Sequence, residues 1–101
     1  VLINNGGGGI FSFLPIAEHT DVFEKYFGTP HSFTFEKIAD QFSLEYAAPR
    51  TLREFRADYK SFLQKNRPAL IEVKTDRQEN HALHLRLYHK IITALEKSDK
   101  Q

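Results

Sequence analysis

The chain has 101 residues, 41% hydrophobic and 27% charged, which is the size and composition of one small globular domain. It contains no cysteine, so disulfide and thiolate chemistry are excluded, and a net charge of +1 argues against a dedicated nucleic-acid binder. No apolar run approaches the roughly 20 residues that span a bilayer, and the start lacks the basic flank of a secretory signal. We therefore expect a cytoplasmic location, no membrane span and no nucleic-acid partner.

The first predicted element is a short strand, Val1–Ile3, because these residues are apolar and mostly β-branched and the run ends at Asn4. Such a strand is expected to be buried on both faces, as in a parallel sheet. The four glycines Gly6–Gly9 then favour neither the continuation of the strand nor the start of a helix, because ordering glycine costs conformational entropy. A buried strand at residue 1 predicts that the chain was cut from a larger α/β domain.

Short helical segments are predicted after the glycines. The stretch "IFSFLP" is predicted to be partly helical and to end at Pro15. A helix over Asp21–Phe27 follows, capped by Thr20 or Asp21 and ended by Gly28. The aromatic residues of this region that we expect in the core are Phe13, Phe23, Tyr26 and Phe27.

The middle of the chain predicts one helix and one strand. The helix begins at Phe33 or Thr34, and the strand is Leu44–Ala47. The apolar side of the helix is formed by Phe35, Ile38, Ala39 and Phe42.

A capping box opens the next helix, in which Thr51 and Glu54 of "TLRE" satisfy each other's backbone donors. Pro68 marks the end of this helix. Its apolar stripe consists of Leu52, Phe55, Tyr59, Phe62 and Leu63.

The strand "ALIEVK" follows, and then a long helix runs to about Lys97, with Thr75 or Asp76 as its cap. The residues at helical spacing are Leu87, Tyr88, Ile91, Ile92 and Leu95, and the tail "KSDKQ" is polar. Strands separated by helices pair in parallel through crossovers. The predicted fold class is α/β: a partial parallel sheet of about three strands with flanking helices, forming one unit over residues 1–101.

The stretch "NNGGGG" lies where open parallel sheets bind ligands, just beyond the carboxyl end of a strand. An asparagine oxygen and a glycine carbonyl would supply two of the roughly six oxygens that Mg²⁺ prefers, with charge from a carboxylate elsewhere. The stretch is neither a P-loop nor a dinucleotide fingerprint. On spacing alone, a structural glycine turn is favoured at least as much as an ion site.

No catalytic residue is assigned. His81 and His84 are spaced i, i+3 and could ligate a metal with Glu79 or His89, but a mostly solvated helix face is favoured. His31 in a loop could reach a substrate. The remaining titratable candidates for which the sequence offers no partner are His19, Glu18 and Asp21.

The stretch "NNGGGGIFSFLP" resembles the end of the motif of thiamin-diphosphate enzymes. Together with "FGTPHSFTFEKIADQFSLEYAAP" and "LIEVKTDRQENHALHLRLY", it is similar to the MenD family, the 2-succinyl-5-enolpyruvyl-6-hydroxy-3-cyclohexene-1-carboxylate synthases. The resemblance covers nearly the whole chain. It implies that the chain is the C-terminal part of the thiamin-diphosphate-binding domain of an enzyme several times longer.

By this resemblance, Asn5 would give its side-chain oxygen and Gly7 its carbonyl to Mg²⁺ or Mn²⁺, and both, with Gly8, would bind the cofactor. The apolar wall near the thiazolium ring and the acceptor substrate would be formed by Ile10, Phe11 and Leu14, of which Ile10 and Phe11 also touch the cofactor. The family usually has Asn or Asp where Gly6 stands. We expect glycine to be tolerated there, because the turn requires a particular backbone conformation at this position.

The family activity is the decarboxylation of 2-oxoglutarate on thiamin diphosphate, followed by addition of the resulting succinyl-semialdehyde carbanion equivalent to isochorismate in menaquinone biosynthesis. The family's remaining metal ligand, its activating glutamate on a partner subunit and its substrate-binding arginines match nothing in this chain. The fragment alone is therefore expected to be inactive, with the rest of the same enzyme and a homo-oligomeric partner subunit as partners. Three alternatives remain open: an enzyme of the acetolactate synthase type, a non-catalytic phosphate- or magnesium-binding α/β module, and a purely structural domain.

Overall fold

A computed structural model describes residues 1–98 and shows an α/β fold built on a three-stranded parallel sheet. Strand β3 (Ala69–Lys74) lies in the centre, between β1 (Leu2–Asn4) and β2 (Glu45–Ala47). Both outer strands run parallel to it, with Leu2 opposite Glu72 in one ladder and Glu45 opposite Ala69 in the other. The predicted fold class, a partial parallel sheet of three strands with flanking helices, is confirmed.

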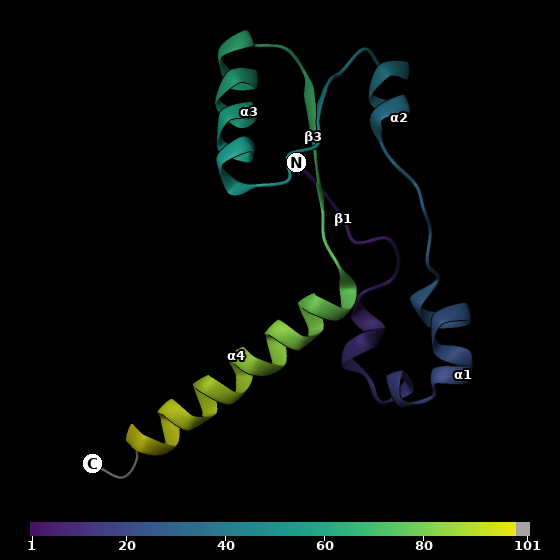
Figure 1. The fold of residues 1–101 in the computed structure, drawn as a ribbon, viewed down its shortest axis with the longest axis vertical. Coiled ribbons are helices and arrows are strands. Elements are labelled where there is room, and N and C mark those ends of the chain that lie inside the picture. Colours follow the sequence, from purple (N-terminus) through teal and green to yellow (C-terminus); the bar gives the residue numbers. More distant parts are fainter. Residues whose placement is uncertain (99–101) are drawn as a thin grey trace.

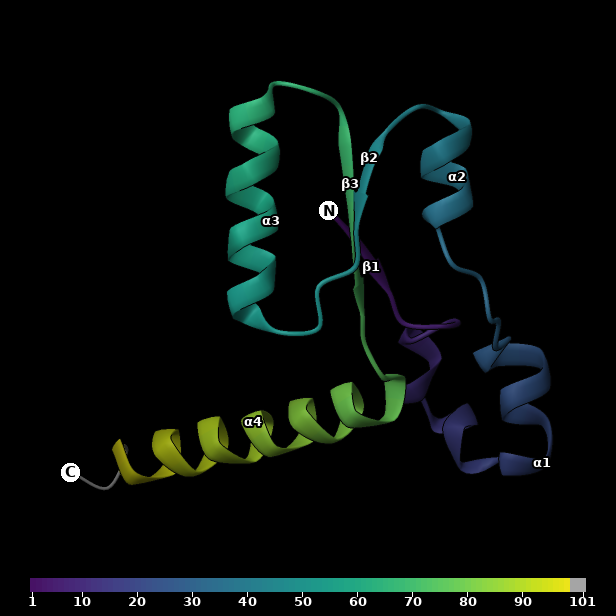
Figure 2. The same ribbon diagram turned by 45° about the horizontal axis from the view of Figure 1, so that its top comes forward.

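Helices α3 (Leu52–Lys65) and α2 (Glu36–Gln41) lie on opposite sides of the sheet, as Figures 1 and 2 show. Helix α4 (Arg77–Ser98) leaves the carboxyl end of β3 and projects away from the sheet. Within residues 1–98, no helix is both long enough and apolar enough to cross a bilayer. The short segments between β1 and α2 are η1 (Ile10–Phe13), η2 (Pro15–Glu18), α1 (Thr20–Phe23) and η3 (Glu24–Gly28).

The first strand differs from its prediction in position and in burial. It covers Leu2–Asn4, one residue later than predicted, and Ile3 is 61% exposed. The prediction of burial on both faces is wrong for the described chain, because Ile3 lines an open groove beside α3. The buried residue of this strand is instead the polar Asn4.

The apolar core is small. Phe23, Ala39 and Ile71 are its buried hydrophobic residues, and Phe27 is half-buried. The prediction that Phe13 and Tyr26 belong to the core is wrong, since both side chains are exposed. The predicted stripes of α3 and α4 do lie on helices, but most of their side chains are exposed: Leu52, Tyr59, Leu63, Leu87, Tyr88, Ile91, Ile92 and Leu95.

The helix starts in the first half of the chain are less regular than predicted. The N-cap of α1 is His19 and makes no side-chain cap bond, so the predicted caps Thr20 and Asp21 are wrong. The chain then widens into the π-helical turn η3. Helix α2 begins at Glu36, two or three residues later than predicted, also without a side-chain cap.

The helix starts in the second half confirm their predictions. Thr51 Oγ1 accepts a hydrogen bond from the Glu54 amide (3.2 Å), and Glu54 Oε2 accepts one from the Thr51 amide (3.1 Å). Asp76 Oδ1 accepts from the amides of residues 78 and 79, both at 2.8 Å, and so caps α4. Helix α3 ends at Lys65, and its C-cap Asn66 has a left-handed backbone (φ 49°) that closes the last turn before Pro68.

Replacing Thr51 by alanine is expected to lower the free energy of unfolding by about 1 kcal/mol, because the Glu54 amide loses the hydroxyl that accepts its hydrogen bond. Chemical denaturation of the protein that contains this chain measures the loss. Thr51→Ser keeps the hydroxyl and is the matched control. A loss with serine as large as with alanine would show that the methyl group, and not the cap, matters.

Candidate functional site

The glycine loop after β1 is held against the last residue of η3 and the backbone that follows it. The Gly8 amide donates to the Gly28 carbonyl (2.7 Å), and the His31 amide donates to the Gly6 carbonyl (2.8 Å). A Cβ at Gly7 would lie 2.5 Å from the Gly28 oxygen, and one at Gly8 would lie 2.9 Å from the carbonyl oxygen of residue 27. Only glycine fits this close approach of two backbone segments.

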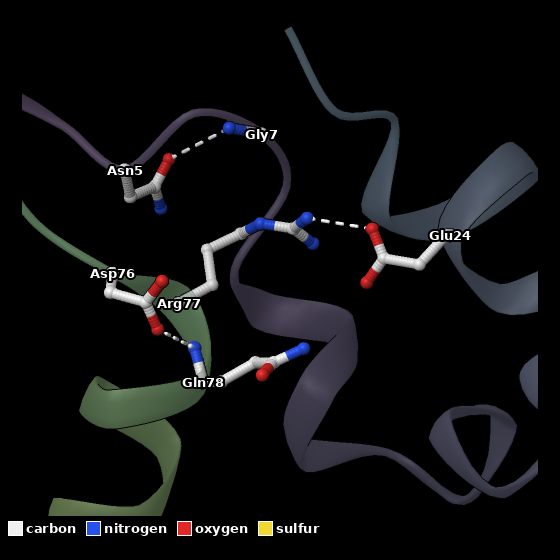
Figure 3. A network of polar contacts seen from close by, with 6 residues as sticks. All are labelled: Asn5, Gly7, Glu24, Asp76, Arg77 and Gln78. Atoms are coloured by element: carbon white, nitrogen blue, oxygen red, sulfur yellow. Dashed lines mark hydrogen bonds and ion pairs between the residues drawn. The ribbon is translucent and has the colours of Figure 1, made fainter.

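The two oxygens predicted to bind a metal lie in this loop. Asn5 Oδ1 accepts from the Gly7 amide at 3.2 Å, an Asx-type turn that Figure 3 shows. Within the described residues the Gly7 carbonyl accepts no hydrogen bond, and both residues are half-buried. Neither oxygen takes part in a strand ladder. The turn therefore keeps the Gly7 oxygen, and the second lone pair of the Asn5 oxygen, available to a ligand.

The side-chain oxygen of Asn5 and the carbonyl oxygen of Gly7 fit part of a Mg²⁺ coordination sphere. They are neutral, hard oxygens, the type that Mg²⁺ prefers, but octahedral coordination takes about six. Among residues 1–98, no group of three or more His, Asp or Glu side chains is arranged to hold a metal.

An arginine supports the loop from below. Arg77 Nη2 donates to Glu24 Oε2 at 2.7 Å, and the side chain of Arg77 is only 14% exposed (Figure 3). Its Nε lies 3.2 Å from the position that a Cβ on Gly7 would take, and its Nη1 lies 2.6 Å from that of Gly28. The sequence pattern predicts no role for these residues at the loop, because Arg77 reaches Glu24 across 53 positions.

The residues predicted to form the apolar wall lie on the neighbouring η1 and the turn after it. Ile10 is 70% exposed, Leu14 47% and Phe11 36%. The Phe11 ring packs edge-to-face on Phe27, with 5.5 Å between the ring centroids. These side chains thus lie next to the loop and are exposed, and their role in a pocket stays a prediction.

The histidines of α4 pack on an aromatic ring. The Phe13 ring meets His81 at 4.9 Å and His84 at 5.2 Å between centroids, both edge-on. His81 is therefore half-buried, so the predicted solvated face holds for His84 but only in part for His81. His31 has a structural role in the loop, since its Nδ1 accepts from the Phe33 amide at 3.2 Å.

A buried carboxylate lies beside the site. Glu72 of β3 is fully buried and accepts from Asn4 Nδ2 at 2.6 Å, from the Tyr46 hydroxyl at 2.5 Å and from the Phe35 amide at 3.1 Å. The sequence offers no signal for this cluster except one: a glutamate in the middle of the apolar strand "ALIEVK". An acidic residue at such a position needs buried donors.

The hydrogen bonds decide the protonation of this cluster. Burial alone would raise the pKa of Glu72, but its three donors outweigh burial and hold that pKa below its ordinary value. Burial and the Glu72 carboxylate raise the pKa of Tyr46 to about 12. The cluster therefore holds an ionised glutamate and a protonated tyrosine at neutral pH.

Both shifts predict how stability depends on pH. Because the pKa of Glu72 is lowered in the folded state, its contribution to the free energy of unfolding is complete above the ordinary glutamate pKa of about 4.3. This contribution is lost as the pH falls through the pKa of the folded state. Because the pKa of Tyr46 is raised, its contribution is complete below about pH 10 and is lost as the pH rises toward 12. Melting temperatures recorded across both ranges measure this. A Tyr46→Phe variant with the same alkaline loss as the wild type would contradict the assignment.

Comparison with known proteins gives close relatives but no matching family model. The chain is 53% identical over 87 residues to the 2-succinyl-5-enolpyruvyl-6-hydroxy-3-cyclohexene-1-carboxylate synthase of Rubrobacter xylanophilus. This match covers 86% of this chain and 15% of the relative. The chain is 44% identical over 98 residues to the protein of the same name from Chlorobaculum parvum, covering 97% of this chain and 17% of the relative. The chain therefore spans about one sixth of the length of these curated relatives.

Proposed function

The chain is homologous to one segment of the 2-succinyl-5-enolpyruvyl-6-hydroxy-3-cyclohexene-1-carboxylate synthases, and on this premise we propose that it is part of such an enzyme. In this proposal the whole protein decarboxylates 2-oxoglutarate and adds the resulting four-carbon unit to isochorismate, a step of menaquinone biosynthesis. The chain is the last part of its thiamin-diphosphate-binding domain. The fragment alone is inactive, because it carries only one wall of the site.

The observation that carries the proposal is the position of the loop within the similar segment. The match to the Chlorobaculum protein covers 98 of the 101 residues, so the turn of Asn5 and Gly7 lies inside it. In that turn the Gly7 oxygen is free of hydrogen bonds among the described residues, and the Asn5 oxygen faces the same turn. The close packing of two backbone segments, where only glycine fits, holds this turn in place.

The residues of this chain would hold the cofactor through its metal. Asn5 Oδ1 and the Gly7 carbonyl would bind Mg²⁺ or Mn²⁺. The Gly8 amide donates to Gly28, and a Cβ at Gly8 would meet the carbonyl oxygen of residue 27, so Gly8 holds the loop in place and its contact with the cofactor stays a prediction. Thiamin diphosphate supplies the electron sink for the decarboxylation when it is bound. The exposed side chains of Ile10, Phe11 and Leu14 would exclude water from its reactive face.

An exposed apolar groove supports the proposal that the chain is part of a larger enzyme. An open groove of about 670 Å³ lies between the sheet and α3, and apolar side chains that include Val1, Ile3 and Leu52 line it. These three side chains are 61% to 66% exposed. Exposed apolar surface of this extent favours association, and we propose that the rest of the same enzyme covers it, with a partner subunit completing the active site.

Calorimetric titration of the full-length protein with thiamin diphosphate and Mg²⁺, followed by an assay with 2-oxoglutarate and isochorismate, tests the proposal. We expect metal-dependent cofactor binding, release of carbon dioxide and consumption of isochorismate. Cofactor binding with pyruvate as the substrate consumed would favour an acetolactate-type enzyme. Absence of cofactor binding would overturn the proposal.

A further inference from the structure

The side chain of Asn4 joins the buried carboxylate to the glycine loop. Its Nδ2 donates to Glu72 Oε1 (2.6 Å) and to the Phe33 carbonyl (2.9 Å), while its Oδ1 accepts from the Gly6 amide (3.1 Å). Asn4 itself is only 9% exposed. One side chain thus connects the centre of the sheet with the residue between the two proposed metal ligands.

The chemistry of its partners fixes which way this amide points. An ionised carboxylate and a carbonyl oxygen can only accept hydrogen bonds, so the amino group of Asn4 must face Glu72 and Phe33. The Asn4 oxygen is then left facing the Gly6 amide. Gly6 has a left-handed backbone (φ 70°), and this hydrogen bond holds its amide in that conformation.

We propose that Glu72 is a positioning residue that acts through Asn4 to fix the Gly6 amide and, with it, the direction of the oxygens of the Asn5–Gly7 turn. The first half of this inference concerns the loop alone. The second half, that the fixed turn binds the metal and cofactor more tightly, rests on the function proposed above.

A carboxylate is needed at this position because three donors converge on it. Besides Asn4, the Tyr46 hydroxyl and the Phe35 amide both donate to Glu72 Oε2. A glutamine could accept on one side only. If the glutamine oxygen faces Phe35, the glutamine amino group faces the amino group of Asn4, and two donors meet. The Asn4 amide must then turn over, which brings the Asn4 amino group against the Gly6 amide, again donor against donor.

Hydrogen–deuterium exchange of the full-length protein without cofactor tests the first half. In Glu72→Gln we expect the Gly6 amide to exchange at least about tenfold faster than in the wild type. The matched control is Tyr46→Phe, which removes a hydrogen bond from the same carboxylate but leaves Asn4 in place, and it should exchange at the wild-type rate. Equal acceleration in both variants, or in neither, would overturn the positioning role.

Asn4→Ala breaks the same link from the other end and keeps the test decisive if Glu72→Gln does not fold. It should reproduce the faster exchange, and wild-type exchange in Asn4→Ala would refute the inference. Calorimetry then tests the second half: the dissociation constant for Mg²⁺ with thiamin diphosphate should rise at least about tenfold in Glu72→Gln and less than about twofold in Tyr46→Phe. If exchange is faster in Glu72→Gln but the wild-type protein binds no cofactor, the proposed function alone is wrong. If exchange is faster in Glu72→Gln but its affinity for the cofactor is unchanged, the second half of the inference is wrong.

Discussion

Replacing Asn5 by alanine in the full-length protein is expected to weaken the binding of thiamin diphosphate with Mg²⁺ by about 100-fold. Loss of groups that merely orient metal ligands already costs about 10- to 100-fold, so loss of a ligand should reach the upper end. The folded state should barely change, because Asn5 contributes one part-buried hydrogen bond of 3.2 Å to the turn. Isothermal titration calorimetry measures the affinity, and the melting temperature without cofactor measures the stability.

The matched control is Asn5→Asp, which keeps a hard oxygen at the same position and can still accept from the Gly7 amide. We expect it to bind the metal at least as tightly as the wild type. If alanine and aspartate weakened binding equally, the side-chain oxygen would not be a metal ligand. If alanine left the affinity unchanged, the loop would be a structural turn.

Replacing Gly7 by alanine is expected to damage both the fold and the site. The new Cβ would stand 2.5 Å from the Gly28 carbonyl oxygen and 3.2 Å from Arg77 Nε, so two backbone segments would have to separate. Overpacking of this kind typically costs about 1–3 kcal/mol. A shift of about 1 Å in a positioned group costs on the order of 100-fold in function. We therefore expect a lower melting temperature together with a loss of cofactor affinity of that order.

Gly6→Asn is the control for this substitution. Gly6 has a left-handed backbone that asparagine tolerates, and the nearest atom to a Cβ there is the His31 oxygen at 3.6 Å. We expect near wild-type stability and affinity from this variant. Equal damage at both positions would mean that the loop tolerates no side chain anywhere, and that the contact with Gly28 is not the reason.

Local patterns predicted the elements whose cause is local. The capping box of Thr51 and Glu54 and the cap by Asp76 could be read from residues three or fewer positions apart. The segment between β1 and α2 was predicted less well. Its helix starts have no side-chain cap, and its π-helical turn is held by contacts that no spacing rule describes.

The candidate site divides in the same way. The resemblance of the stretch "NNGGGG" to a cofactor motif named Asn5 and Gly7, and the structure places both in one turn with the Gly7 oxygen free within the described residues. Their metal role stays a prediction. The supports of the loop were not predictable, because Arg77 meets Glu24 across 53 positions and Asn4 meets Glu72 across 68.

The sequence by itself determined the order of strands and helices, the parallel sheet, the glycine loop at a strand end and the family resemblance. These features depend on residue type and short spacing, which a linear pattern records. Only the tertiary structure decided which glycines face backbone, which way the Asn4 amide points and which apolar stripes stay exposed. Burial and hydrogen-bond partnership are properties of neighbours in space, and in a three-stranded sheet those neighbours come from distant parts of the chain.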